Sequence, residues 1–241
     1  MKTILRPSAF ALLCAAFTLS LTSSGLAGVV VQKDFTRAEG GVQSDLSEMS
    51  FWTGDPVNSW GEIALEALPA GMADSPKNAL KVVTNPAAPA APDGSKFAPL
   101  IEFKTPGFGS AENTKKAVYL LRFFVPVDGN YRTDIHFGGN WDSNAAILVL
   151  GKNTINAMEQ GTPTKVCDYS PMAWQDLQVE FDCVGKTYSI FMNGKKAANA
   201  VPWNNPKLSS IESLSIIAGA MPVERDRTPV LYIEKIDISG N

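Results

Sequence analysis

Short hydrophobic runs separated by turn residues make up most of the chain. In the clearest run Leu177, Val179 and Phe181 are apolar, whereas the residues between them are polar or charged. This alternation of apolar and polar residues predicts a strand with one buried and one solvent-exposed face. Similar runs, bounded by Gly, Pro, Asn and Asp, predict about a dozen strands. They cover residues 29–35, 62–68, 79–84, 99–104, 117–125, 131–137, 145–150, 164–168, 175–182, 187–193, 213–218 and 230–238.

The order of these elements predicts an all-β protein. Only residues 153–160 could hold a short helix, and they lack a strong apolar stripe. Strands without crossover helices favour antiparallel sheets. We therefore expect an antiparallel β-sandwich of the jelly-roll kind, with the terminal strands 29–35 and 230–238 as neighbours in one sheet. Residues 85–99 are rich in Pro and Ala. They are interpreted as a surface loop within a single domain, 28–241, rather than as a linker between two domains.

Two hairpins follow from the pattern. A two-residue turn at Val184-Gly185 would pair Phe181 with Tyr188, and the glycine suits the positive φ that such a turn needs. A second hairpin is expected to join 117–125 to 131–137 through Asp128-Gly129.

The first 27 residues have the layout of a secretory signal peptide. Lys2 and Arg6 precede an uncharged apolar stretch at 9–21, and small residues end the segment at Ala27. We expect cleavage after Ala27 and a secreted or periplasmic protein. No later apolar run is long enough to cross a membrane.

Export changes how the cysteines are interpreted. Removing the leader takes away Cys14 and leaves Cys167 and Cys183, an even pair in an oxidising compartment. No HxxxH or CxxC partner accompanies them, so a disulfide between Cys167 and Cys183 is preferred to a zinc site. The chain also has 21 basic and 24 acidic residues in 241, without a basic block. This balance argues against nucleic acid as a partner.

Two segments resemble a known group of folds. A tryptophan opens the alternating strand at 174–182, and after a short turn the strand 186–194 ends in Asn-Gly. This pattern resembles the central hairpin of concanavalin A-like, laminin G-like jelly rolls, and residues 231–238 resemble their last strand. The resemblance implies two curved antiparallel sheets with a concave face open to extended ligands such as polysaccharides. The group contains lectins, carbohydrate-binding modules, glycoside hydrolases and polysaccharide lyases.

Catalytic motifs of this group are incomplete here. Its hydrolases carry a Glu-x-Asp-x-x-Glu strand, but after Glu180 and Asp182 the third carboxylate is missing, so a solvated strand face is the preferred interpretation. Its alginate lyases carry Gln-Ile-His, where this chain has Asp134-Ile135-His136. Their arginine-rich and Tyr-Phe-Lys motifs are absent. His136, Arg132 and Asp134 are therefore weak catalytic candidates, better explained as a structural hydrogen-bond network.

The same three residues begin the predicted ligand site, because Arg132, Asp134 and His136 point to one side of their strand. The strand runs into Gly138-Gly139, after which the site continues with Asn140, Trp141 and Asp142. Polar groups there would bond sugar hydroxyls and the indole would stack on a ring. Arg122, one strand earlier, joins this row only if the Asp128-Gly129 connection carries a bulge.

No cofactor or metal is predicted. Residues 140–144 could offer oxygen ligands to Ca²⁺, but one carboxylate in five residues is more typical of a polar turn. The sequence thus predicts a secreted jelly roll that binds polysaccharide or glycoconjugate without catalysis. The alternative is a polysaccharide lyase or glycoside hydrolase of the same fold, and a third hypothesis is a structural or adhesive envelope protein.

Overall fold

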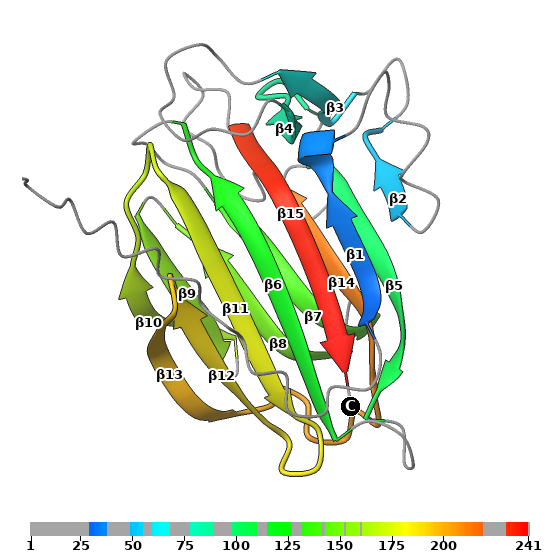
Figure 1. Cartoon of the computed structure of the whole chain (residues 1–241), viewed down its shortest axis with the longest axis vertical. Coiled ribbons are helices and arrows are strands. Elements are labelled where there is room, and N and C mark those ends of the chain that lie inside the picture. Colours follow the sequence, from blue (N-terminus) through cyan, green and yellow to red (C-terminus); the bar gives the residue numbers. More distant parts are fainter. Residues whose placement is uncertain are drawn as a thin grey trace, which may run out of the picture.

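The computed structural model describes residues 29–37, 49–54, 59–67, 78–88, 98–109, 115–126, 132–140, 143–151, 153–159, 161–218 and 230–240. Within them the chain forms two antiparallel sheets packed face to face, with β6, β11 and β15 toward the viewer and β7, β8 and β14 behind them (Figure 1). A single helical turn, η1 (Phe35–Arg37), follows the first strand. The structure confirms the predicted all-β sandwich. The predicted signal peptide and most of the Pro/Ala-rich loop lie outside the described residues.

The first sheet has eight strands among the described residues. Their spatial order is β13 (Lys195–Pro202), β12 (Thr187–Met192), β11 (Trp174–Asp182), β6 (Lys116–Phe124), β15 (Val230–Gly240), β4 (Asn78–Thr84) and β3 (Gly61–Ala67), with β1 (Val29–Asp34) pairing with β15 outside this order. The pairing of β1 with β15 confirms that the two terminal strands are neighbours in one sheet.

In the part of the chain that the structure describes, the second sheet has seven strands. Their order is β10 (Thr162–Asp168), β9 (Thr154–Glu159), β8 (Ser143–Leu150), β7 (Thr133–Asn140), β14 (Ile211–Ala218), β5 (Leu100–Phe108) and β2 (Met49–Trp52). Strands β7, β14 and β5 are neighbours in this sheet although they are far apart in the sequence. This arrangement brings distant polar residues onto one surface.

The core fills the space between the sheets. Tyr119 from the eight-stranded sheet packs edge-on against Phe137 from the seven-stranded sheet, with ring centroids 5.1 Å apart. Phe181 contacts both rings, at 5.6 and 5.3 Å. Each large apolar side chain buried in this way contributes about 1.5–3 kcal/mol relative to an exposed one. One face of nearly every strand is therefore committed to the core, which leaves the outer faces and the edges of the sandwich for ligands.

The β11–β12 hairpin is as predicted in register: Phe181 lies opposite Tyr188. The detail of the turn differs, because the positive φ belongs to Lys186 (53°) and not to the glycine. Gly185 is needed for space instead. A Cβ there would lie 2.7 Å from Oδ2 of the Asp182 carboxylate, whose other oxygen, Oδ1, accepts the Val184 and Gly185 N–H groups.

The predicted hairpin between 117–125 and 131–137 is wrong. β6 pairs with β11 and β15, whereas β7 pairs with β8 and β14 in the other sheet. Both strands have an apolar row that faces the core, and placing them in opposite sheets buries both rows against each other. Arg122 therefore lies on the opposite side of the sandwich from Arg132.

The predicted helix at 153–160 is also wrong, because residues 154–159 form β9. Ile155 and Ala157 alternate with polar residues and are buried, and β9 is paired on both sides, with β8 and β10. Such pairing overrides the weak local preference of a short segment. The structure also adds β2 and β13, which the pattern did not predict.

The predicted disulfide is wrong as well: Cys167 and Cys183 are both free. Tyr169, two residues after Cys167, packs its ring on Phe123 near the end of β6. The Cys183 N–H instead donates to the Lys115 carbonyl, just before β6 begins. At about 3.3 Å per residue these ends of β6 lie roughly 25 Å apart, whereas a disulfide needs Cα atoms within about 7 Å.

Candidate functional site: the polar face of the seven-stranded sheet

The predicted polar row lies on the outer surface of the seven-stranded sheet. Thr133, Ile135 and Phe137 of β7 are buried toward the core. Because side chains alternate along a strand, Asp134 and His136 point outward. We call the part of this outer surface between β2 and the start of β8 the polar face; its polar or aromatic members in the described chain are Ser50, Trp52, Glu102, Lys104, Arg132, Asp134, His136, Asn144, Ser213 and Ser215.

One row of the polar face crosses five strands at the level of His136. Ile147 of β8 lies on one side of His136 and Ser215 of β14 on the other. Ser215 in turn lies opposite Glu102 of β5, and Glu102 lies opposite Ser50 of β2. Residues paired across antiparallel strands point to the same side of the sheet. This row therefore combines an imidazole, two hydroxyls and a carboxylate.

A second row, at the level of Asp134, ends in an exposed aromatic residue. Asp134 lies opposite Ile217, and this row continues through Leu100 to Trp52 on the edge strand β2. Leu100 and Ile217 form a small apolar cluster with Ala98, separate from the main core. Trp52 is 48% exposed, which is unusual for so large an apolar side chain. Its indole thus shares one surface with the hydrogen-bonding row.

Arg132 is fully engaged with Asp134. Its Nε donates to one carboxylate oxygen at 2.7 Å and a terminal nitrogen donates to the other at 2.9 Å. This paired geometry is among the stronger kinds of ion pair, and it raises the pKa of Arg132. The Asp134 side chain is only 11% exposed. The pair therefore anchors the face and leaves the guanidinium largely occupied.

His136 is held close to neutrality by its surroundings. Burial lowers its pKa; the Asp134 carboxylate opposes this effect, and the Arg132 charge adds to it. Asn144 Nδ2 lies 3.4 Å from the imidazole Nδ1. An imidazole that is uncharged at neutral pH can donate through one nitrogen and accept through the other. It is thus suited to bonding a hydroxyl group.

Gly138 allows Asn144 to reach His136. The register of β7 and β8 shifts on both sides of this glycine, which brings the Asn144 side chain over it. A Cβ at Gly138 would lie 2.5 Å from the Asn144 amide oxygen and 2.4 Å from the Ser143 carbonyl oxygen. Any other residue would push β8 away at this point.

The structure brings together only part of the predicted site. Arg132, Asp134 and His136 lie on one face, as expected. Asn140 ends β7, but its side chain is not described, and Trp141 and Asp142 lie outside the described residues. In the described part of the chain no cluster of three His, Cys, Asp or Glu side chains could hold a metal ion. Nor does any helix described there have the length and apolar character to cross a membrane.

Trp52, Glu102 and Ser215 were missed by the sequence prediction. A partial signal existed, since Glu102 alternates with the buried Ile101 and Phe103, and Ser215 alternates with the buried Leu214 and Ile216. Alternation shows that a residue faces outward, but it does not show which strands are neighbours. The pairing of β5, β14 and β7 had to come from the structure.

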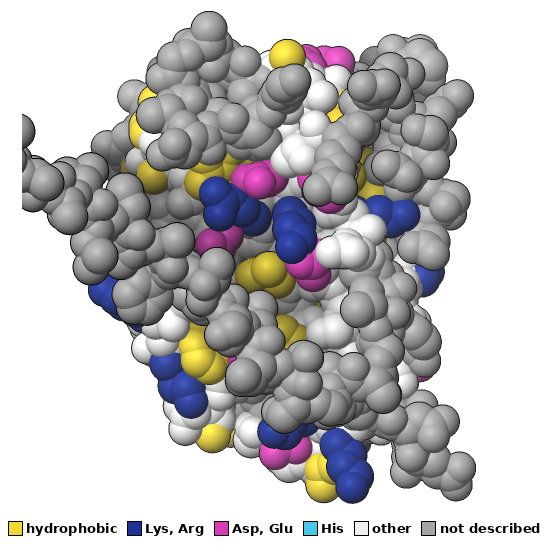
Figure 2. Space-filling model, in the orientation of Figure 1, with side chains coloured by type: hydrophobic (Ala, Val, Ile, Leu, Met, Phe, Trp, Pro, Cys, Tyr) yellow, Lys and Arg dark blue, Asp and Glu magenta, His cyan; other side chains and the backbone are white. Residues whose placement is uncertain are grey.

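The outer face of the eight-stranded sheet has a different character. Figure 2 looks onto this side and shows Lys or Arg side chains next to Asp or Glu side chains near its centre. Arg122 bridges Glu234 of β15 and Asp176 of β11, and Lys235 pairs with Asp237. We call these five residues the ionic face.

No protein-family model matches the sequence, and no curated protein sequence matches it. Solved structures, however, share the fold. A sialidase superposes on 88% of this chain with a TM-score of 0.66 and 13% identity, although the match covers only 18% of the sialidase. The GH131 β-glucanase catalytic domain from Podospora anserina matches over 89% of this chain and 97% of its own, with a TM-score of 0.59 and 11% identity.

A third similar structure is alginate lyase A1-II′, a member of polysaccharide lyase family 7. It covers 73% of this chain and 83% of its own, with a TM-score of 0.53 and 9% identity. At identities this low the likeness establishes the fold alone. The sandwich is a concanavalin A-like jelly roll, which confirms the resemblance inferred from residues 174–194 and 231–238.

Proposed function

We propose that this protein is exported, loses residues 1–27, and uses the polar face to bind a neutral polysaccharide or glycoconjugate without catalysis. The observation that carries the proposal is the exposed indole of Trp52 on the same surface as the row of His136, Ser215 and Glu102. An aromatic platform beside directional hydrogen-bonding groups is the combination that a sugar ring requires. The ring offers C–H groups on its face and hydroxyls around its rim.

The dimensions of the polar face suit an extended ligand. The row from Ile147 to Ser50 crosses five neighbouring strands. With strands about 4.8 Å apart, it measures roughly 19 Å. A surface of this length can contact several consecutive sugar rings, which favours a polymer over a single monosaccharide.

The charge pattern points to an uncharged ligand. Three cations lie on the outer side of this sheet in the described chain, and each is paired with a carboxylate: Arg132 with Asp134, Lys104 with Glu102 at 3.1 Å, and Lys165 with Asp168 at 2.8 Å. A polyuronate would have to compete with these carboxylates for its cations. Hydroxyl groups, by contrast, can bond Ser215, His136 and the outer lone pairs of Glu102 without breaking an ion pair.

Similar folds support a carbohydrate partner in general terms, because a β-glucanase and an alginate lyase are among them. A lyase is the second candidate function, since His136 is a largely neutral imidazole on the polar face and could accept a proton. Against it, the Arg132 guanidinium is already occupied by Asp134. It is poorly placed to neutralise the carboxylate of a uronate.

One experiment separates these functions. The exported protein is incubated with laminarin, xylan and cellulose as neutral polysaccharides, and with alginate and polygalacturonate as acidic ones. Retention, new reducing ends and new unsaturated ends are measured together. We expect retention on at least one neutral polymer without products. Products would support an enzyme, and neither retention nor products would support a structural protein. The mass of the exported chain tests cleavage after Ala27.

Paired charge variants test the neutral preference. Glu102→Gln releases Lys104 on the polar face, whereas Glu66→Gln releases Lys81 from its 2.8 Å ion pair on the other sheet. Both substitutions change the net charge equally. We expect only Glu102→Gln to gain measurable binding to alginate at low salt, and 0.5 M NaCl should abolish this gain because exposed charges are screened. An equal gain in both variants would show that overall charge, not the polar face, controls binding.

A further inference from the structure

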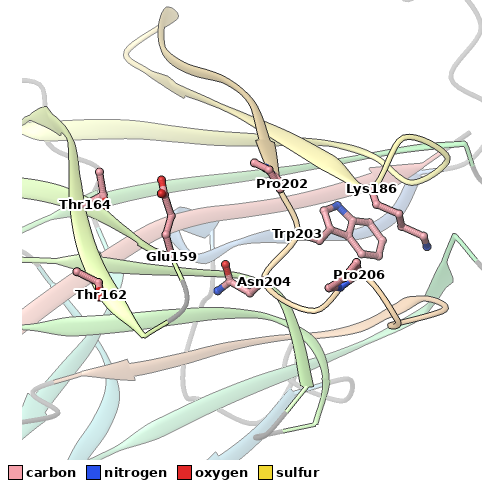
Figure 3. A pocket seen from close by; sticks show the side chains of 8 residues that line it. All are labelled: Glu159, Thr162, Thr164, Lys186, Pro202, Trp203, Asn204 and Pro206. Carbon is pink, nitrogen blue, oxygen red and sulfur yellow. The ribbon is translucent and has the colours of Figure 1, made fainter.

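A cavity of about 550 Å³ opens between the β9–β10 hairpin and the segment that follows β13. Figure 3 shows Glu159, Thr162 and Thr164 on one side of this cavity, and Pro202 and Trp203 on the other. The volume is within the range of roughly 300–1,000 Å³ that is typical of small-molecule sites. The cavity is distinct from the polar face, because its walls come from β9, β10, Lys186 and residues 202–206.

The wall formed by Trp203 and Asn204 is fixed in place. The Trp203 N–H donates to the Lys186 carbonyl at 2.9 Å, and its indole Nε1 donates to the Thr187 carbonyl at 3.2 Å. The Asn204 N–H donates to the Ala145 carbonyl of β8 at 2.9 Å. These bonds join the segment after β13 to both sheets. The cavity is therefore preformed and would not have to be organised by a ligand.

Four polar side chains at the cavity are available to a ligand. They belong to Glu159, Thr162, Thr164 and Asn204, and none of them is hydrogen-bonded or ion-paired to another residue in the described part of the chain. The carboxylate accepts hydrogen bonds, the hydroxyls donate and accept, and the amide does both.

A buried group lies close to Glu159. The Tyr188 side chain is 1% exposed and its hydroxyl has no hydrogen-bond partner within the described chain. Burial raises the pKa of Tyr188 to about 12, and the charge of Glu159 adds to this shift. An orphaned buried hydroxyl is uncommon in native proteins and calls for an explanation. A ligand or an ordered water near Glu159 would supply the missing partner.

The charge of the lining restricts the ligand. Lys186 donates its Nζ hydrogens to the carbonyls of Leu208 and Ser209 and lies over the Trp203 ring at 4.1 Å, so its ammonium is occupied. Glu159 is then the charged group of the lining that can interact with a ligand, and its carboxylate would repel an anion. A lone exposed carboxylate gives a cation little binding energy in water, but it readily accepts bonds from hydroxyls.

We propose that this cavity is a second binding site, for one or two rings of a neutral sugar. Sugar hydroxyls bond Glu159, Thr162, Thr164 and Asn204, and the apolar sides of Pro202 and Pro206 meet the C–H groups of the ring. A jelly roll with this site holds an extended chain on the polar face and a short sugar, or the end of a chain, at its β9–β10 edge.

The test uses the indole N–H resonance of Trp203 in the intact protein, assigned with a Trp203→Phe variant. The probes are glucose, galactose, mannose, cellobiose and maltose, each titrated to 50 mM, with glucuronate and galacturonate as charged counterparts of two of them. We expect a saturable shift with at least one neutral sugar and none with the uronates. Loss of one hydrogen bond in Asn204→Ala or Thr164→Val should weaken binding about fivefold.

A variant of the polar face provides the matched control. His136→Ala combined with Ser215→Ala should leave the Trp203 titration unchanged, because neither residue lines the cavity, while reducing polysaccharide retention. Thermal unfolding of every variant checks that it is folded. The proposal is overturned if no neutral sugar shifts the resonance, if a uronate shifts it equally, or if Asn204→Ala and Thr164→Val both bind as the unchanged protein does.

Discussion

The two outer surfaces of the sandwich are built by the same rule and differ in what they offer a ligand. On the ionic face, Arg122 bridges Asp176 and Glu234, and Lys235 pairs with Asp237. On the polar face, His136, Ser215 and Trp52 lie beside two ion pairs, Arg132 with Asp134 and Lys104 with Glu102. Both surfaces come from the outward residues of alternating strands, so alternation alone does not distinguish them.

The difference lies in the charge of the groups that each surface offers a ligand. Charged groups that satisfy one another present little to an uncharged ligand, and separating them requires breaking charge-assisted bonds. Hydroxyls and a neutral imidazole exchange water for sugar hydroxyls at small cost, because one hydrogen bond replaces another. A surface for neutral polysaccharide is thus recognised by neutral hydrogen-bonding groups near an exposed aromatic ring, and not by its number of charges.

The largest expected effect concerns the aromatic group. Trp52→Ala should weaken retention of a neutral polysaccharide by about 2 kcal/mol, roughly thirtyfold, as loss of a central aromatic contact does. Because half of the indole is already exposed, the free energy of unfolding should change by less than about 1 kcal/mol. Affinity electrophoresis and urea unfolding measure the two quantities.

Phe191→Ala is the matched control on the other sheet. Phe191 is partly exposed on the outer side of β12, where Lys196 lies over its ring at 5.3 Å. Its loss should leave polysaccharide retention unaltered. If Phe191→Ala weakens retention as much as Trp52→Ala does, binding is not confined to the polar face.

A smaller effect should distinguish the ion pair of Arg132 from that of Arg122 by what each contributes to the free energy of unfolding. Asp134→Ala removes the only carboxylate paired with Arg132 among the described residues and leaves a partly buried guanidinium uncompensated. Asp176→Ala leaves Arg122 still paired with Glu234. We expect a loss of about 1–3 kcal/mol in the first variant and less than about 1 kcal/mol in the second. Equal losses in urea unfolding would contradict the distinction drawn between the two arginines.

Much of the fold was predictable because strand alternation is local. The register of Phe181 against Tyr188 followed from one turn and two apolar rows. The errors arose where the structure of a segment depends on which distant strand it pairs with. Residues 153–160 carry too weak a pattern to reveal β9, and nothing local shows that 117–125 and 131–137 enter opposite sheets. The predicted disulfide failed for the same reason, since Cys167 and Cys183 lie near opposite ends of β6.

The candidate site was predictable only along its own strand. Arg132, Asp134 and His136 could be placed on one side because they lie in one run. Trp52 and Glu102 join them through β2, β5 and β14, and those pairings bring together residues that are remote in the sequence. Sequence patterns thus gave the outward direction of each side chain, whereas the contacts that make a binding surface depend on sheet order.

The smallest expected effect is a pH dependence specific to the polar face. The ordinary pKa of His136 is 6.5, and burial lowers it in the folded protein. The unfolded chain therefore takes up a proton at a higher pH than the folded chain, so stability rises with pH through this window. The stabilisation that the neutral imidazole contributes should be complete above about pH 6.5. It should decline as the solution is acidified toward the lowered pKa. Urea unfolding is measured between pH 7.5 and 5.5, an interval that includes this window. His136→Asn should remove the slope over that interval in urea unfolding, while the unchanged protein keeps it. If both chains show the same slope, the imidazole is not the group that senses pH, and the neutral state assigned to it on the polar face is wrong.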